Sequence, residues 1–455
     1  MNRVLPRSAV LTFPERTRPD GPSSSVEVGD DVRRFKAQLH RRLVVGMDLS
    51  ALQSMSREQL RLEVRRVAEE LCQRSPNLLN QQEREQLVNE VLDETFGLGP
   101  LESLMRDPTI SDILINGAQT VYVERNGKLE QTNVTFSDPA HLIHIIQRIV
   151  SQAGRRVDET CPMVDSRLPD GSRINAIIPP LALDGALVSI RKFGAKPIRA
   201  ADLVAGKSLP QEMMDFLNTC VRGRMNILVS GGTGSGKTTL LNALSAAIPA
   251  YERVITIEDA AELRLQQPHV GRLETRPNNV EGVGIVTTRD LVRNALRMRP
   301  DRIVIGECRG PEALDMLQAM NSGHEGSMST IHANDTRDAL GRLEMMVGMA
   351  GFDLPLWVIR RQIASAVHIV VQVSRLMGGS RKVVKVSEVT GVEGENYAMQ
   401  DLFVFKQTGV DEHRRAQGCF QTTGLRPNCM ERLESLGESL PVELFRKRII
   451  HALPH

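Results

Sequence analysis

The chain has 455 residues, of which 41% are apolar and 25% charged, as is ordinary for a globular protein with room for two or three domains. Lysine and arginine number 57 against 55 for aspartate and glutamate, and this near-balance excludes nucleic-acid binding driven by an overall basic field. No run of about 18 uncharged apolar residues occurs, and the first residues are too broken by proline and charge for a secretory signal. A cytoplasmic location is therefore expected.

The residue composition changes twice along the first third of the chain. Residues 1–31 carry Pro, Gly, Ser and charge without a period, which predicts a disordered tail. Residues 32–96 predict three short amphipathic helices, the second capped by Ser56, that form either a docking arm or a packing element. The helical pattern ends at "GLGP", and residues 97–195 read as an α+β domain. Its hairpins are predicted at Asn126-Gly127 and at Pro169-Asp170-Gly171, with a helix from Pro139 between them.

Residues 196–209 are expected to be a linker, and from 210 to 455 short apolar strands alternate with helices. "MNILVSG", "RVITIED", "DRIVIGE" and "GSMSTIHA" have the composition of strands buried on both faces of a parallel sheet. Hairpin-like turns follow Ser374, and "VELFRKRIIHAL" is expected to be helical. The fold class is therefore α/β for this domain.

The stretch "NILVSGGTGSGKTTLLNAL" contains a complete P-loop between a predicted strand and a predicted helix. Glycines allow backbone N–H groups to wrap a phosphate, and the helix N-terminus adds its positive dipole end. Lys237 is expected to reach the β- and γ-phosphates, and the Thr238 hydroxyl to ligate Mg²⁺. The expected nucleotide-binding residues are Gly231, Gly232, Thr233, Gly234, Ser235, Gly236, Lys237, Thr238 and Thr239.

Carboxylates and histidines end three further strands. Glu307 follows "RIVIG", where P-loop enzymes hold the metal-bound and attacking waters. Glu258 closes another strand, with Asp259 and Glu262 beside it, and three carboxylates so close require a nearby cation. "NSGHEGSMSTIHAND" adds His332, in a position to sense a γ-phosphate. The guanine-specifying N-K-x-D pattern is absent, so a GTPase is not expected.

In this order and spacing, these stretches resemble the Walker A, Asp box, atypical Walker B and His box of the secretion ATPase superfamily. "ISDILINGAQTVYVERNGKLE" and "RPDRIVIGECRGPEALDMLQAMNSGHEGSMSTIHAND" resemble the branch that assembles Tad/Flp pili, the CpaF-like ATPases. The six cysteines have no paired spacing, unlike the tetra-cysteine zinc module of type II secretion relatives, and this favours the same branch.

The resemblance implies a hexameric ring of two-lobed subunits, each with an N-terminal domain linked to a RecA-like ATPase domain that hydrolyses Mg-ATP. The resemblance gives Glu258 and Glu307 the roles of general base and of ligand to the metal-bound water, and the residues leave open which of the two is the base. Thr238 and Glu307 would be the metal-binding residues. His332 would contact the γ-phosphate. The family also places arginines of the N-terminal domain over the phosphates, and here Arg167, Arg173 and Arg191 are the matching positions. Arg167 and Arg173 flank the predicted turn at Pro169-Asp170-Gly171 and can lie side by side at the base of that hairpin.

The implied partners are an inner-membrane platform and other copies of the chain, with peripheral membrane association through those partners and no nucleic acid. Two alternatives stay open. A RecA-like nucleic-acid motor needs stacking residues, and aromatics make up only 3% of the chain. A ring that binds ATP as a gated scaffold with little hydrolysis is disfavoured by the intact Glu258, Glu307 and His332.

Overall fold

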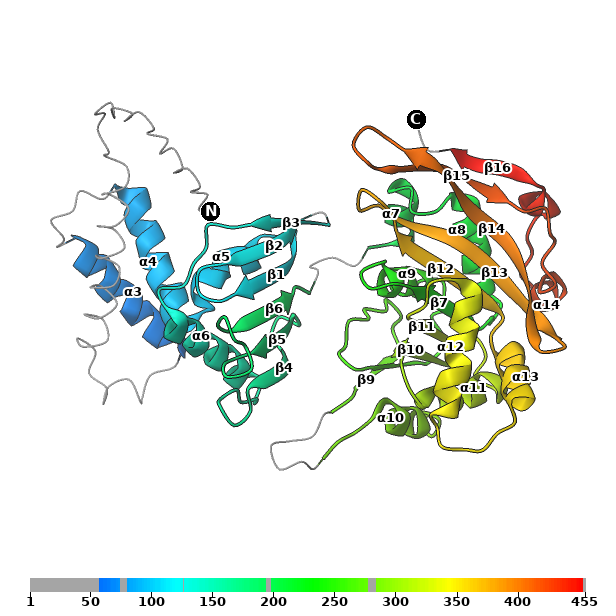
Figure 1. The fold of residues 1–455 in the computed structure, drawn as a ribbon, viewed down its shortest axis with the longest axis horizontal. Helices are drawn as coiled ribbons and strands as arrows, with labels where there is room; N and C mark the ends of the chain where they lie inside the picture. Colours follow the sequence, from blue (N-terminus) through cyan, green and yellow to red (C-terminus); the bar gives the residue numbers. More distant parts are fainter. Residues whose placement is uncertain (1–56, 74–79, 126, 194–197, 277–283, 453–455) are drawn as a thin grey trace, which may run out of the picture. The chain divides into compact units, whose positions relative to one another are not determined.

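The computed structural model describes residues 57–73, 80–125, 127–193, 198–276 and 284–452. The chain divides into two compact units, Met1–Ser103 and Leu104–His455 (Figure 1). The predicted tail 1–31, the first predicted helix and the Ser56 cap lie outside the described residues. Among those described, no helix is both long enough and apolar enough to cross a membrane.

Two long helices form most of the described part of the first unit. They are α3 (Arg57–Gln73) and α4 (Gln81–Phe96), which correspond to the second and third predicted helices. They share a small apolar core of Val64, Ala68, Leu87, Val88, Val91 and Leu92. The predicted break is confirmed, because α4 ends at Phe96 and the 3₁₀ helix η1 (Gly99–Leu101) follows with Pro100 in its first turn.

The second unit begins with a six-stranded antiparallel sheet in the order β3-β2-β1-β6-β5-β4. Its strands are β1 (Ile110–Asn116), β2 (Val121–Arg125), β3 (Lys128–Gln131), β4 (Met163–Arg167), β5 (Arg173–Ile177) and β6 (Leu187–Arg191). The hairpins β2–β3 and β4–β5 confirm both turn predictions. Two helices accompany the sheet, α5 (Glu102–Arg106) and α6 (Pro139–Gln152), and Asp138 caps α6 by accepting the His141 N–H at 2.8 Å.

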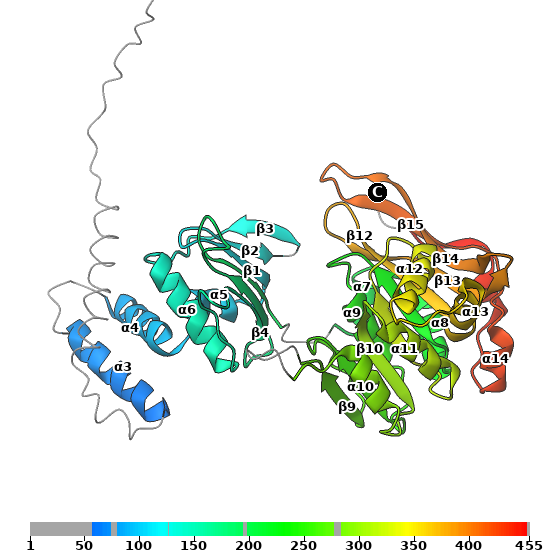
Figure 2. The ribbon, with the colours of Figure 1, turned by 60° about the horizontal axis from the view of Figure 1, so that its bottom comes forward.

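A ten-stranded sheet follows, in the order β16-β15-β14-β13-β12-β7-β11-β10-β8-β9 (Figures 1 and 2). Neighbours are parallel from β12 to β9 and antiparallel from β12 to β16. The parallel strands are β7 (Ile227–Gly231), β8 (Val254–Glu258), β9 (Val270–Glu274), β10 (Arg302–Cys308), β11 (Met328–Ile331) and β12 (Ile369–Arg375). The remaining strands are β13 (Arg381–Glu393), β14 (Asn396–Val410), β15 (Ala416–Thr422) and β16 (Arg448–Ala452).

Helices cover both faces of this sheet, as a parallel sheet requires. Ile227 and Val229 of β7 belong to the core formed with α8 (Gln211–Arg222) and α9 (Lys237–Ser245), whereas Leu228 belongs to the core on the opposite face. That second core contains residues of α10 (Thr288–Ala295), α11 (Glu312–Asn321), α12 (Thr336–Gly348) and α13 (Leu356–Ala366). The predicted α/β class is confirmed, and β7 lies near the middle of the sheet.

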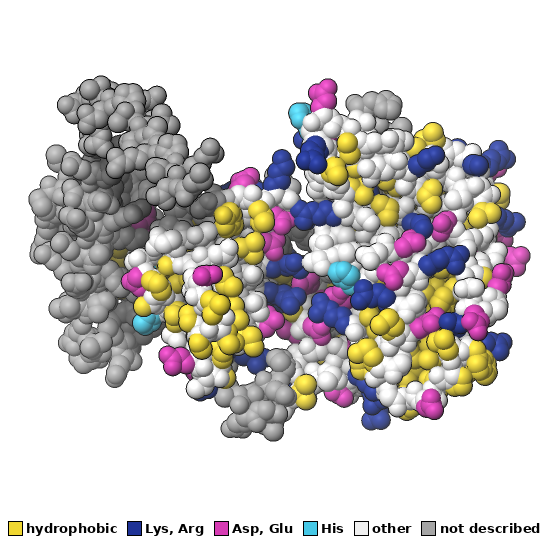
Figure 3. All heavy atoms as spheres, viewed as in Figure 1, with side chains coloured by type: hydrophobic (Ala, Val, Ile, Leu, Met, Phe, Trp, Pro, Cys, Tyr) yellow, Lys and Arg dark blue, Asp and Glu magenta, His cyan; other side chains and the backbone are white. Residues whose placement is uncertain are grey.

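The segment expected as a linker is partly structured. Within residues 198–209, α7 (Ala200–Ala205) packs Leu203 and Val204 against the core of the second sheet, and Leu209 is fully buried in it. On the face shown in Figure 3, basic and acidic side chains are interspersed over the domain that contains the ten-stranded sheet.

The prediction of a helix in "VELFRKRIIHAL" is wrong. A short 3₁₀ helix, η2 (Val442–Phe445), is followed by strand β16, which pairs with β15. The edge of β15 offers unpaired backbone groups, and strand pairing satisfies them. Ile450 packs against the core while Ile449 stays 60% exposed. Consecutive side chains therefore alternate between core and solvent as in a strand, and strand pairing overrides the local preference for a helix.

Candidate functional site

The P-loop joins the end of β7 to the start of α9 at the carboxyl edge of the parallel strands. Gly234 and Gly236 have φ angles of +67° and +102°, which side chains with a Cβ rarely adopt. A Cβ on Gly231 would lie 2.3 Å from the carbonyl oxygen of Val373 on the neighbouring strand. These three glycines therefore allow the loop to turn tightly against the sheet.

A cavity of about 500 Å³ opens beside this loop. Most of the candidate residues line it: Gly232, Thr233, Gly234, Ser235, Gly236, Lys237, Thr238, Thr239, Glu258, Glu307, His332, Arg173 and Arg191. Gly231 and Arg167 do not line it, although Gly231 precedes Gly232 and Arg167 lies opposite Arg173, and both of those residues do. Phosphate-wrapping backbone, carboxylates, imidazole and guanidinium groups thus share one cavity.

The Lys237 ammonium lies across the loop. Its Nζ donates to the carbonyl oxygens of Gly231 at 3.0 Å and Gly232 at 3.1 Å, and lies 3.9 Å from Oε1 of Glu307. Burial lowers its pKa, and the charge of Glu307 opposes that shift. Lys237 is therefore a partly desolvated cation held on carbonyl oxygens, which a phosphate would outcompete as a partner.

Glu307 is bound on its other side by a residue that the sequence did not single out. Its Oε2 accepts hydrogen bonds from Nε and Nη2 of Arg309, the former at 2.9 Å. The same guanidinium lies 3.6 Å from Oδ2 of Asp259. Arg309 therefore bridges the acids that end β8 and β10, and it is one of the cations that their proximity predicted.

Glu258 is almost fully buried, with 4% of its surface exposed. Its Oε1 accepts the N–H groups of Glu262 and Leu263, both at 2.8 Å, while its Oε2 is buried and has no hydrogen-bond partner among the described residues. Burial raises the pKa of this carboxyl to about 7, despite the two backbone hydrogen bonds. A group with this pKa can accept and release a proton near neutral pH.

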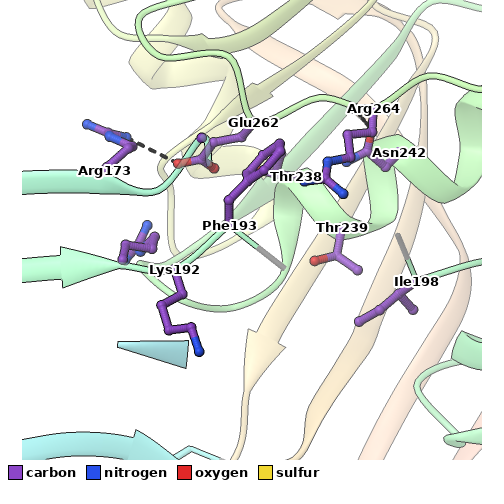
Figure 4. A pocket seen from close by; sticks show the side chains of 11 residues that line it. Arg173, Lys192, Phe193, Ile198, Thr238, Thr239, Asn242, Glu262 and Arg264 are labelled. Carbon is purple, nitrogen blue, oxygen red and sulfur yellow. Dashed lines mark hydrogen bonds and ion pairs between the residues drawn. The ribbon is translucent and has the colours of Figure 1, made fainter. Parts of the chain in front are cut away.

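The three candidate arginines occupy one row across the six-stranded sheet. Arg167 pairs with Arg173 across β4 and β5, and Arg173 pairs with Arg191 across β5 and β6. Like charges placed opposite one another repel, so the row requires acidic partners. Arg173 Nη1 lies 3.2 Å from Oε1 of Glu262 (Figure 4). Arg191 Nε lies 3.4 Å from Oδ1 of Asp112.

Arg167 contacts the same acidic segment from outside the cavity. Its Nη1 lies 2.8 Å from Oε2 of Glu274, and its Nη2 donates to the carbonyl oxygen of Ala261. Arg167 and Arg173 therefore both contact the stretch that surrounds Glu258. The prediction that they lie side by side at the base of the hairpin is confirmed.

His332 comes directly after β11, and two side-chain hydrogen bonds anchor the segment, one from β11 to β10 and one from β12. The Thr330 hydroxyl donates to the carbonyl oxygen of Gly306 at 2.7 Å, and Nε2 of Gln372 donates to that of Ala333 at 3.2 Å. His324 precedes β11 and is not among the residues that line the cavity.

Several lining residues were not anticipated. Arg309 follows Glu307 by two residues, so its position at a strand end could have indicated it. Arg375 ends β12 and Arg381 begins β13, and no local pattern connects this hairpin to the P-loop. An adjoining hollow contains the ring of Phe193, whose centroid lies 3.6 Å from the Arg264 guanidinium carbon (Figure 4).

The oxygen atoms that line the cavity fit a cation that binds together with a nucleotide. In the part of the chain that the structure describes, no three His, Cys, Asp or Glu side chains converge as a ready-made metal centre. Mg²⁺ is commonly held by one or two protein oxygens together with substrate phosphates. Thr238 and Glu307 line the same cavity and provide such oxygens, and Glu258 Oε2 is an unsatisfied acceptor beside them.

Comparison with known proteins gives consistent matches. The family model described as "Type II/IV secretion system protein" matches residues 94–432. A "Putative conjugal transfer protein" of Mycobacterium tuberculosis (strain ATCC 25618 / H37Rv) is 37% identical over 312 residues, which are 67% of this chain and 88% of the relative. "Type IV secretion system protein PtlH" of Bordetella pertussis (strain Tohama I) is 35% identical over 314 residues, 63% and 92% of the two chains.

Among solved structures, the VirB11 ATPase from the Brucella suis type IV secretion system is 32% identical, covers 65% of this chain and 97% of its own, and has a TM-score of 0.35. The family match alone spans most of the chain and contains every candidate residue. This chain therefore belongs to the type II/IV secretion system protein family, the secretion ATPase superfamily that its motifs resemble.

Proposed function

We propose that this chain is a Mg-ATP-hydrolysing motor that drives pilus assembly or secretion of the Tad/Flp type. The observation that supports this most directly is the P-loop cavity, which combines Lys237 with the carboxylates Glu258 and Glu307 and with two arginines of the six-stranded domain. Binding alone would not require a buried carboxyl whose pKa is about 7.

In the proposed reaction, the P-loop N–H groups and Lys237 hold the phosphates of ATP. Glu258 is the stronger candidate for general base, because its free Oε2 can take the proton of an attacking water. Thr238 and Glu307 would hold Mg²⁺, which when bound neutralises phosphate charge. Arg173 and Arg191 would stabilise the charge that develops on the γ-phosphoryl oxygens, in the manner of arginine fingers.

The same contacts suggest how hydrolysis becomes work. Arg173 forms an ion pair with Glu262, so the γ-phosphate and Glu262 would compete for one guanidinium. Binding and loss of that phosphate would then move the six-stranded domain relative to the RecA-like domain. In a hexameric ring of such subunits, this motion would act on an inner-membrane platform, with the ring on the cytoplasmic side and peripheral to the membrane.

The deciding experiment is the rate of Mg-ATP turnover per chain over a dilution series of the purified protein, with Lys237→Ala as a blank. A rate per chain that climbs with concentration supports active sites completed between subunits and the ring motor. A flat rate would contradict the ring requirement. Binding without turnover would favour the gated scaffold, and stimulation by single-stranded DNA would favour the nucleic-acid motor.

A further inference from the structure

The turn between β12 and β13 brings two arginines to the P-loop. β12 runs parallel to β7 with Val373 opposite Gly231, so the turn after Arg375 lies at the same edge of the sheet as the phosphate loop. The turn is tight: the Leu376 N–H donates to the Ser380 carbonyl oxygen at 2.7 Å. Arg375 and Arg381 both line the P-loop cavity.

These two arginines form a cross-strand pair. Arg375 and Arg381 lie directly opposite each other in the β12–β13 register, an arrangement that is destabilising unless an anion compensates it. Arg375 has partial compensation, since its Nη2 lies 3.8 Å from Oε1 of Glu124. Arg381 has no carboxylate within ion-pair distance among the described side chains, and its Nε donates to the Gly234 carbonyl oxygen at 2.9 Å.

The strand order limits which phosphate Arg381 can meet. β12 flanks β7 on one side, whereas β11, β10 and β8 lie on the other. His332 directly follows β11, and Glu307 and Glu258 belong to β10 and β8. The γ-phosphate is expected on the side of those catalytic groups. An arginine on the β12 side therefore flanks the part of the phosphate chain nearer the nucleoside, which ATP and ADP have in common.

We infer that Arg381 binds the α- or β-phosphate of a nucleotide held by the P-loop of its own chain. The inference rests on the proposed function, because it requires a nucleoside di- or triphosphate in the cavity. Bound in this way, Arg381 exchanges a neutral carbonyl partner for a phosphate oxygen, which is the stronger hydrogen bond. It also relieves the repulsion from Arg375.

The test is calorimetric titration of the full chain with ADP and with a non-hydrolysable ATP analogue, both with Mg²⁺. Arg381→Ala is expected to weaken both nucleotides by similar factors, about 10- to 100-fold, the loss typical of a hydrogen bond to a charged group. Arg381→Lys should recover part of the affinity. The matched control is Arg446→Ala, another exposed arginine whose carboxylate partner, Glu443 at 3.3 Å, lies on η2 outside the cavity.

Each other result would overturn the inference. Unchanged ADP affinity in Arg381→Ala, with wild-type binding intact, would refute the contact and leave the proposed function standing. Weakening confined to the ATP analogue would place Arg381 at the γ-phosphate instead. An equal loss of nucleotide affinity in Arg446→Ala would show that the effect comes from removing a positive charge anywhere on the chain. A wild-type chain that binds neither nucleotide would refute the proposed function along with the inference.

Discussion

Gly306 and Glu258 lie beside each other on the neighbouring strands β10 and β8: a Cβ on Gly306 would stand 2.8 Å from Cγ of Glu258. The glycine before Glu307 therefore makes room for a buried carboxyl that comes from another motif. The two acid-bearing strands form one packed unit, in which the side chain of the first fills the space that the second leaves empty.

Gly306→Ala is expected to lower the free energy of unfolding by about 1–3 kcal/mol through overpacking, and to reduce ATP turnover by displacing Glu258. Urea unfolding and a steady-state ATPase assay measure the two effects. Gly341→Ala is the control, because a Cβ at this position in α12 meets nothing within 4 Å. It should stabilise the chain by about 0.5–1 kcal/mol, as expected for glycine replaced by alanine inside a helix. Equal behaviour of the two variants would contradict the packing argument.

Glu258→Gln is expected to change how stability depends on pH. Because the folded pKa is raised from 4.5 to about 7, the folded state holds a proton that the unfolded state releases in this window. Wild-type stability relative to the variant should therefore fall as pH rises from about 4.5 to about 7, by on the order of 3 kcal/mol, and then level off. Urea unfolding of both chains at a series of pH values from about 4 to about 8 measures this difference in stability. A constant difference across the range would show that Glu258 titrates normally.

Glu307→Gln should leave nucleotide binding largely intact and lower turnover by at least about 100-fold, whether Glu307 acts on water or on metal. The amide keeps the shape of the side chain but loses the charge that faces Lys237 and Arg309. Calorimetric titration and turnover assays separate the two effects. Normal turnover in this variant would remove Glu307 from the catalytic role.

Arg173→Ala should lower turnover by about 10³- to 10⁵-fold if Arg173 acts as an arginine finger. Its ion pair with Glu262 is about one-third exposed, with side-chain exposures of 34% and 29%, so the free energy of unfolding should change by only about 0–1 kcal/mol. The matched control is Arg125→Ala, whose pair with Asp107 is similarly exposed, at 33% and 28%, but lies outside the cavity. Parallel losses of activity in both variants would indicate a structural effect.

Local signals made most of the fold predictable. The P-loop, the strand ends that carry Glu258 and Glu307, the helix after Asp138 and both hairpins of the six-stranded sheet follow from motif, cap and turn chemistry that operates within a few residues. The pairing of Arg167 with Arg173 followed as well, because a short hairpin fixes its own register.

Contacts between distant segments decided the rest. The sequence alone determined that a phosphate loop, two acid boxes, a histidine and a basic hairpin exist, because each is encoded by adjacent residues. Only the tertiary structure decided that Arg381 meets Gly234, that Gly306 yields its space to Glu258 and that the last strand extends β15. These relationships depend on strand order and side-chain packing across the sheet, which the spacing of residues along one segment does not carry.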